Sequence, residues 1–140
     1  IEWLVLKKDN FQVLLISKSS LFAKQFNSSN NNYWNTSTLC SFLNKEFWNT
    51  AFTTDEKKMV INTHLIDVAS KNNVFILSYD ESRNLFNGND ERKTISSSRW
   101  WLRSQNESHV WGVDTDGLVD RKFSSTETQS VHPAIYIRKR

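Results

Sequence analysis

A pair of adjacent tryptophans constrains this chain more than any other feature. Residues 96–104 read SSSRWWLRS, a short strand-like segment between polar residues. Successive side chains of a β-strand point to opposite faces, so Trp100 shares a face with Leu102, and Trp101 shares a face with Arg103. A strand with a tryptophan on each face needs protein on at least one side and a covering loop on the other. The segment therefore predicts a layered domain with at least one of the two tryptophans in its core.

The same strand predicts an ion pair. Arg103 lies on the face of Trp101, and a buried guanidinium requires a carboxylate partner. Glu81, in the segment LSYDE just after an apolar run, is our candidate for that partner. We expect the pair to be structural, with Glu81, Arg103 and Trp100 holding the loop region against the sheet.

Alternation and capping signals predict an α+β domain. A hairpin is predicted over 1–17 with its turn at Asp9-Asn10, and its two apolar faces indicate a central position in the sheet. Helices are predicted over 37–48, capped by Ser37, and over 53–62, where Thr53 and Glu56 have capping-box spacing. The other predicted elements are a buried strand (74–78), one or two helical turns (79–86), a hairpin (109–123) and a closing strand (131–138). The polar segments 18–35, 87–93 and 124–130 are predicted as loops.

Composition excludes several classes of protein. With 140 residues, 38% of them apolar, the chain has the size of a single domain over residues 1–140. No apolar run approaches the roughly 20 residues of a membrane-spanning helix, so we expect no direct membrane insertion. The net charge of +3 is spread along the chain, which does not favour nucleic-acid binding. Cys40 is the only cysteine, so no internal disulfide and no thiolate metal pair is possible, and no cofactor is expected.

Several segments taken in order resemble a large bacterial family of unknown function. They are IEWLVL, LLISK, STLCSFLNKEFWNTAFTTDEKK, VFILS followed by Glu81, WWLRS, a V-x-x-x-G hairpin and the closing VHPAIYI. That family is similar to the C-type-lectin-like fold in the version shared with formylglycine-generating enzymes. The resemblance implies a twisted antiparallel sheet, two flanking helices and long loops that form one binding face. It also implies that the first and last strands, within Ile1–Leu6 and Ala134–Arg138, lie side by side. His132 stands where the family has arginine.

The chemistry known for this fold can be compared with the residues present. Formylglycine formation needs two cysteines, the related iron enzymes need clustered histidines, and calcium-dependent lectins use a Glu-Pro-Asn loop; the chain has none of these patterns. Asp114 and Asp116 in DTDGLVD are weak candidates for calcium ligands. The same residues are also typical of a type I′ hairpin turn with Asp116-Gly117 at its tip, and we favour the turn.

The remaining aromatic and charged residues suggest a binding surface. Tyr33, Trp34 and Trp111 lie beside polar loops, where flat rings stack on sugar rings and polar groups bind hydroxyls. We expect the following residues to contact a glycan or protein ligand: Tyr33, Trp34, Trp101, Arg103, Trp111 and His132.

Three functions remain open at this point. The first is a non-catalytic binding module secreted by a bacterium or displayed on its surface, which recognises a glycan or a protein. The second is a structural or assembly domain in which the aromatic residues form the core. The third is a degenerate enzyme that brings His132, Glu81 or Asp114 together in one pocket. The sequence does not specify an oligomeric state.

Overall fold

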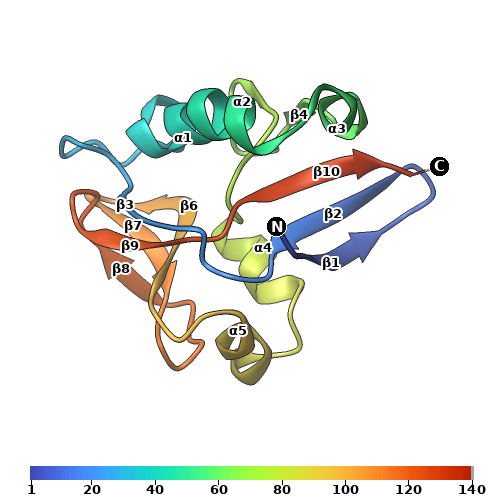
Figure 1. Cartoon of the computed structure of the whole chain (residues 1–140). Helices are drawn as coiled ribbons and strands as arrows, with labels where there is room; N and C mark the ends of the chain where they lie inside the picture. Colours follow the sequence, from blue (N-terminus) through green and yellow to red (C-terminus); the bar gives the residue numbers. More distant parts are fainter. Residues whose placement is uncertain (140) are drawn as a thin grey trace.

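The computed structural model describes residues 1–139, and its strands form two main sheets that one C-terminal segment joins (Figure 1). The antiparallel three-stranded sheet has the order β1-β2-β10 and the five-stranded sheet the order β3-β9-β6-β7-β8. The short strands β4 and β5 form a third pair. The strand bounds are β1 (Trp3–Lys8), β2 (Gln12–Ser17), β3 (Phe22–Gln25), β4 (Thr63–His64), β5 (Lys71–Asn72), β6 (Trp100–Asn106), β7 (His109–Val113), β8 (Arg121–Phe123), β9 (Thr128–Val131) and β10 (Ala134–Arg138).

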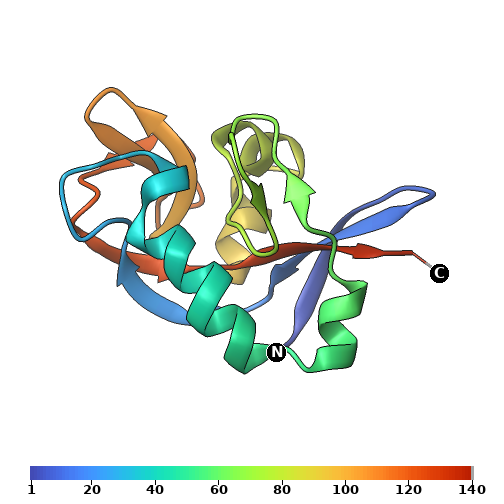
Figure 2. The same ribbon diagram turned by 90° about the horizontal axis from the view of Figure 1, so that it is seen from above.

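Helices cover the sheets on two sides (Figures 1 and 2). One long helical segment runs through α1 (Thr38–Phe42), a π-helical turn η2 (Leu43–Phe47) and α2 (Trp48–Ala51), and α3 (Thr54–Met59) follows it. The shorter helices α4 (Tyr79–Asn84) and α5 (Asn89–Ile95) lie on the other side, and the 3-10 turn η1 (Trp34–Thr36) precedes α1. The fold is therefore a mixed α+β arrangement, as predicted.

Two helix starts lie where the capping signals predict them. The Ser37 hydroxyl accepts a hydrogen bond from the Cys40 amide at 3.0 Å and begins α1. Thr53 and Glu56 form a reciprocal capping box at the start of α3. Because caps depend on residues within one turn, sequence alone is sufficient to place them.

The tryptophan pair is entirely internal. Trp100 is 1% exposed and Trp101 is not exposed at all. The Trp101 ring contacts Phe26 and Phe123, with ring centroids 5.5 and 5.9 Å away, and its Nε1 donates to the Lys24 carbonyl at 2.8 Å. Both faces of β6 are therefore covered, which agrees with the prediction of a sandwiched strand.

The N-terminal hairpin forms over the predicted residues, but its position differs from the expectation. β10 pairs with β2 and not with β1, so the first strand and the last strand are not neighbours. β1 is instead an edge strand, with Val5 62% exposed and a bulge between Val5 and Lys7. A bulge and lysines on an edge strand are typical of edges that must not pair with another chain. The expected single antiparallel sheet is also wrong, because there are two main sheets and β6 runs parallel to β9.

The apolar segment 74–78 is extended and buried but is not a strand of either main sheet. Phe75 exchanges two backbone hydrogen bonds with Ala134 of β10, and the Leu77 carbonyl accepts from the Arg103 amide of β6 at 2.9 Å. The segment thus crosses from one sheet to the other and forms backbone hydrogen bonds with one residue of each. Its apolar run reflects complete burial between the sheets, which sequence cannot distinguish from burial within a sheet.

Three segments predicted as loops contain regular structure. β3 lies within 18–35 and pairs with β9, which itself begins inside the polar segment 124–130. α5 occupies most of 87–93 and extends to Ile95, because Arg92 and Ile95 are both buried. The Arg92 guanidinium donates to the carbonyls of Ser82 and Gly117 at 3.0 and 2.7 Å. The polar composition of these segments gave no signal for regular structure, because the residues that they pack against or pair with lie far away in the sequence.

His132 lies at the junction between the two sheets, where β9 ends and β10 begins (Figure 1). It is 1% exposed and contacts the Trp100 ring, with centroids 5.1 Å apart. Its Nδ1 donates to the Ser17 carbonyl at 3.1 Å, since a carbonyl only accepts. Its Nε2 has no hydrogen-bond partner among residues 1–139. The ring is therefore held in the neutral form, and burial lowers the pKa of His132.

We expect the stability of the fold to decrease as the pH falls below about 6.5. The unfolded chain protonates His132 near that pH, whereas the folded chain protonates it only at lower pH, because burial lowers its pKa. The unfolded state binds more protons in this window, so the free energy of unfolding falls by up to about 1.4 kcal/mol per pH unit. Urea unfolding between pH 5.5 and 7.5 measures this slope.

Two variants control for other titrating groups. His132→Gln keeps a donor for the Ser17 carbonyl and removes the titration, so the slope between these pH values is expected to flatten. His109→Gln changes an exposed histidine and is expected to leave the slope intact. An unchanged slope in His132→Gln contradicts the assignment.

Candidate functional site

A cleft of about 620 Å³ lies between four segments that are distant in sequence. The segments are the residues around η1, the β4–β5 loop, the start of α4 and the second half of β6, which lie near one another in Figure 2. The lining consists of Asn32, Tyr33, Trp34, Asn35, Ile66, Asp67, Val68, Ala69, Ser78, Asp80, Glu81, Arg103, Ser104 and Gln105.

Arg103 is fully buried beneath this cleft and holds two carboxylates. Its Nη1 donates to Glu81 Oε1 at 2.6 Å and to the Ile76 carbonyl at 2.8 Å. Its Nε and Nη2 both donate to Asp67 Oδ1, at 3.1 and 2.8 Å. Burial lowers the pKa of Arg103, but the two carboxylates raise it further, and the net direction is upward. The guanidinium therefore stays charged and fixes both acids in place.

Glu81 also belongs to the local structure of α4. Its Oε1 accepts from the Ser78 amide at 2.8 Å, and the Ser78 hydroxyl accepts from the Glu81 amide at 3.1 Å. This capping box places Glu81 at the first turn of the helix, directly beside β6. The predicted Arg103–Glu81 ion pair is thus present in the structure. Asp67, the second partner, was not predicted, because nothing in the segment LIDVAS distinguishes it from a surface acid.

Each of the two carboxylates has one oxygen that Arg103 does not use. Asp67 Oδ2 and Glu81 Oε2 form no hydrogen bond within residues 1–139, although Oδ1 and Oε1 each accept two. The side chains are 40% and 24% exposed, so both are accessible from the cleft. With Asp80 nearby on α4, the lining carries three acidic groups and one arginine. The cleft therefore presents oriented acceptors and a negative field.

The exposed lining of the cleft includes an aromatic and an apolar side chain among its polar groups. Tyr33 is 59% exposed, and Ile66 is fully exposed. Trp34 also contributes to the lining but is only 4% exposed, and its Nε1 donates to Asn72 Oδ1 at 2.8 Å. Trp34 is therefore mainly a core residue, and Tyr33 is the ring available for stacking.

Three of the six predicted contact residues line this cleft, and the other three do not. The three are Tyr33, Trp34 and Arg103, and Glu81, which was predicted as a structural partner, lines the cleft as well. Trp101 and His132 are buried elsewhere in the core, so neither can touch a ligand in the folded chain. Trp111 is half-buried and packs on Tyr79, with ring centroids 4.7 Å apart.

The aspartates of the β7–β8 hairpin have structural partners. Asp114 accepts from Arg99 and Arg121 at 3.0 and 2.8 Å, and from the Thr115 amide at 2.8 Å. The Thr115 amide first, and then Arg121, lower the pKa of Asp114 to about 2. Asp116 accepts from the Leu118 amide. Residues 1–139 contain no group of three His, Cys, Asp or Glu side chains arranged to hold a metal ion.

The turn itself also differs from the expected type I′ form. A type I′ turn needs a positive φ at both central residues, and only Gly117, with φ of 85°, has one here. The Gly117 amide donates to the Asp114 carbonyl, and the Asp114 amide donates to the Leu118 carbonyl. This pattern is a three-residue loop in which glycine takes the left-handed position after a tight turn.

The groups of the enzyme alternative are not assembled in the cleft. Glu81 lines it, but His132 is in the interior and Asp114 is on the β7–β8 hairpin. Cys40 is buried, and burial raises the pKa of its thiol to about 11, so very little thiolate exists at neutral pH. Within residues 1–139 no helix combines the length and the apolar character that crossing a bilayer requires.

Comparison with known proteins supports one part of the resemblance noted in the sequence, namely membership of a family of unknown function. A family model described as a domain of unknown function (DUF6273) matches residues 10–139, which is nearly the whole chain. No curated protein and no solved structure matches it. The chain therefore belongs to the DUF6273 family of domains of unknown function.

Proposed function

We propose that this domain is a non-catalytic binding module that takes a glycan in the Arg103 cleft. One observation carries the proposal: a single buried guanidinium fixes two carboxylates that line the same cavity, and one oxygen of each forms no hydrogen bond within residues 1–139. Sugar hydroxyls donate hydrogen bonds to such preoriented acceptors, and little ordering is needed when the ligand binds. Tyr33 at the rim provides a flat face for the apolar side of a sugar ring.

The charge of the cleft indicates which glycans fit. Asp67, Asp80 and Glu81 outnumber Arg103, whose buried side chain already donates four hydrogen bonds to Asp67, Glu81 and the Ile76 carbonyl. A sugar that carries a carboxylate, sulfate or phosphate would meet repulsion and find no free cation there. We therefore expect neutral sugars or amino sugars to bind, since the hydroxyls of both can donate to these acceptors and a protonated amino group adds a positive charge.

Binding is favoured over catalysis by the composition of the lining. Within the described residues, the lining contains no histidine, cysteine or lysine, which are common nucleophiles and proton-transfer groups. The two central carboxylates are engaged by the same guanidinium, so they are held as a pair of acceptors.

We further propose that the fold is C-type-lectin-like and that the domain acts on a bacterial surface or in secreted form. The pairing of the N-terminal hairpin with the C-terminal strand, the flanking helices and the loop-built cleft all support this fold. The surface location is what the family resemblance implies.

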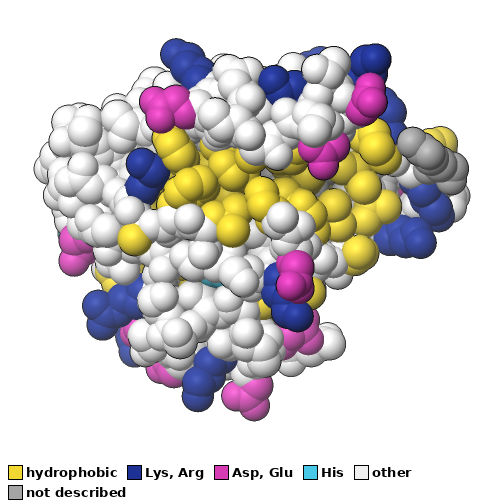
Figure 3. Space-filling model, in the orientation of Figure 1, with side chains coloured by type: hydrophobic (Ala, Val, Ile, Leu, Met, Phe, Trp, Pro, Cys, Tyr) yellow, Lys and Arg dark blue, Asp and Glu magenta, His cyan; other side chains and the backbone are white. Residues whose placement is uncertain are grey.

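An assembly role is the second candidate, and a surface feature favours it. Figure 3 shows a continuous apolar area between the helical layer and the three-stranded sheet. The partly buried side chains that pack on the core include Trp3, Leu15, Trp48, Phe52 and Ile137, and the rings of Trp3 and Trp48 both contact Phe52. An apolar area of this kind is typical of a contact with another protein surface. A protein that stays monomeric at high concentration, as measured by sedimentation, would argue against self-assembly through it.

A glycan array that includes neutral, amino and acidic sugars tests the main proposal, with and without a calcium chelator. We expect hits among neutral or amino sugars. In a fluorescence or calorimetric titration of such a hit, Tyr33→Ala should weaken affinity by about three- to tenfold, the size of one aromatic contact. Asp67→Asn should weaken it as well, because it removes an oriented charged acceptor.

Matched variants separate binding from folding. Phe11→Ala also removes an exposed aromatic ring, and Asp120→Asn also neutralises an exposed aspartate, but both lie outside the cleft. Both should leave affinity unchanged. Hits confined to acidic glycans, or full affinity in Tyr33→Ala and Asp67→Asn, would overturn the proposal.

A further inference from the structure

The tip of the β1–β2 hairpin presents an aromatic side chain on a firmly held turn. Asp9 Oδ1 accepts from the amides of Phe11 and Gln12 at 2.7 and 2.9 Å, and the Asp9 amide donates to the Gln12 carbonyl. Phe11 is nevertheless 81% exposed. The hairpin extends beyond the helices in both ribbon views, so this ring lies at an outer end of the molecule (Figures 1 and 2).

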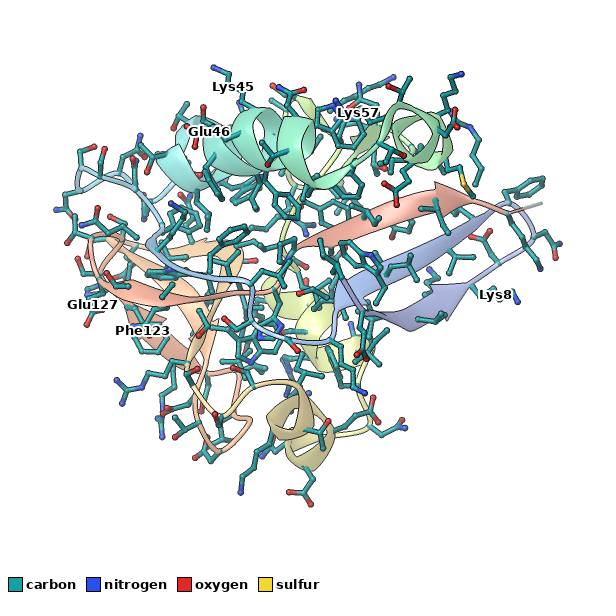
Figure 4. The ribbon with its side chains drawn as sticks, viewed as in Figure 1. Lys8, Lys45, Glu46, Lys57, Phe123 and Glu127 are labelled. Atoms are coloured by element: carbon teal, nitrogen blue, oxygen red, sulfur yellow. The ribbon has the colours of Figure 1, made fainter. Side chains whose placement is uncertain are left out.

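Three lysines belong to the segments that meet at this turn. Lys7 and Lys8 end β1, and Lys139 follows β10, whose end lies at the turn because the Lys139 amide donates to the Phe11 carbonyl at 2.9 Å. All three lysines are exposed, and none forms an ion pair within residues 1–139. Figure 4 shows Lys8 at the far end of β1, and dark blue side chains gather at this end in Figure 3.

Asp9 is the only acid among these tip residues, and it is tied to the turn. The backbone amides of Phe11 and Gln12 lower the pKa of Asp9, so it stays ionised and bonded to them. One negative charge remains against the charges of Lys7, Lys8 and Lys139. The hairpin tip, defined here as Lys7, Lys8, Asp9, Phe11 and Lys139, therefore carries a net positive charge beside an exposed apolar ring.

We propose that the hairpin tip adsorbs to membranes that contain anionic lipids. Phe11 enters the headgroup region, and the three lysines contact lipid phosphates. An aromatic side chain flanked by lysines is suited to this interface, where the ring leaves water while the ammonium groups remain hydrated. Each basic residue near an anionic leaflet adds favourable free energy.

The shape of the tip favours a membrane over an acidic protein. A stable protein contact needs a broad complementary surface, whereas the tip projects a single ring on a narrow hairpin. Mobile lipid headgroups can rearrange around scattered lysines. The contact is peripheral, since only a side chain enters the interface, and it uses residues separate from the glycan cleft.

Co-sedimentation with vesicles tests the proposal. The full chain is mixed with vesicles of phosphatidylcholine alone, or of equimolar phosphatidylcholine and phosphatidylglycerol. We expect adsorption to the mixed vesicles only, with a decrease as the salt concentration rises. The double variant Lys7→Gln/Lys8→Gln should lower the partition coefficient by about tenfold or more, given the contribution of each charge. Phe11→Ser should lower it by about fivefold through the lost apolar burial.

Control variants remove the same groups elsewhere. Lys45→Gln/Lys122→Gln removes two exposed charges outside the tip, and Lys45 lies on the helical layer in Figure 4. Ile66→Ser removes a fully exposed apolar side chain of the β4–β5 loop. Both should adsorb like the parent chain. Equal adsorption to the two kinds of vesicle would overturn the proposal. So would full adsorption by Phe11→Ser, because the lysines would then act as a general anion-attracting surface that an acidic protein would fit equally well.

Discussion

Trp101→Ala is expected to reduce the free energy of unfolding by about 3–5 kcal/mol, the range for removing a buried aromatic side chain. Trp101 has no exposed surface and packs between Phe26 and Phe123. The substitution leaves a cavity and also removes the donor to the Lys24 carbonyl. Because domains of this size are typically stable by about 5–15 kcal/mol, much of the total stability depends on this ring. Urea unfolding followed by circular dichroism measures the loss.

Trp48→Ala is the matched control for that experiment. Trp48 is only partly buried and contacts Phe52, with ring centroids 5.2 Å apart, on the surface of the helical layer. Removing its ring takes away less buried apolar surface than removing Trp101, so a clearly smaller loss of unfolding free energy is expected. Equal losses in the two variants would mean that Trp101 is less central to the packing than its burial indicates.

Arg103→Ala is expected to reduce the free energy of unfolding by about 3 kcal/mol, the lower end of the range for breaking a buried ion pair. The lower end applies because Asp67 and Glu81 are partly exposed and can be rehydrated. The Ile76 carbonyl, by contrast, loses a donor within the core. Arg103→Lys should recover only part of the loss, since one ammonium group cannot reproduce bonds to three acceptors in a fixed fork.

The same variant connects the fold to the proposed glycan site. Without Arg103, Asp67 loses its only protein partner within residues 1–139 and can move, so glycan affinity should fall even where the protein is fully folded. Arg121→Ala is the control, because this arginine is about half exposed and pairs with Asp114 outside the cleft. It should change stability by less than about 1 kcal/mol and leave affinity intact. If folded Arg103→Ala protein bound the glycan with the affinity of the parent chain, the ion pair would have no role in binding.

The two proposals concern separate surfaces, so their tests are independent. The cleft is built by β6, α4 and two loops, whereas the hairpin tip belongs to β1, β2 and the end of β10. A tip variant that loses vesicle adsorption should keep glycan affinity, and Tyr33→Ala should keep vesicle adsorption. If both proposals hold, the domain would bind a glycan while resting on an anionic surface.

The features that the sequence determined depend on near neighbours or on strict alternation. The caps at Ser37 and Thr53 need only the next helical turn, and the hairpin turn at Asp9 needs only the following amides. The period of two in WWLRS requires that Trp100 and Trp101 face opposite ways. Burial of Arg103 then required an acid, and Glu81, in the LS-x-x-E segment that follows the apolar run, was the predicted partner.

Only the tertiary structure decided which distant segments meet. β10 pairs with β2 and leaves β1 at the edge, because hydrogen-bond partners in a sheet are chosen by long-range packing that no local pattern specifies. Asp67 reaches Arg103 because the β4–β5 loop folds over β6, and nothing in its own sequence marks it. His132 is neutral and unavailable to a ligand because the sheet junction encloses it. Local sequence thus set the elements, while the cleft arose from contacts between residues far apart in the chain.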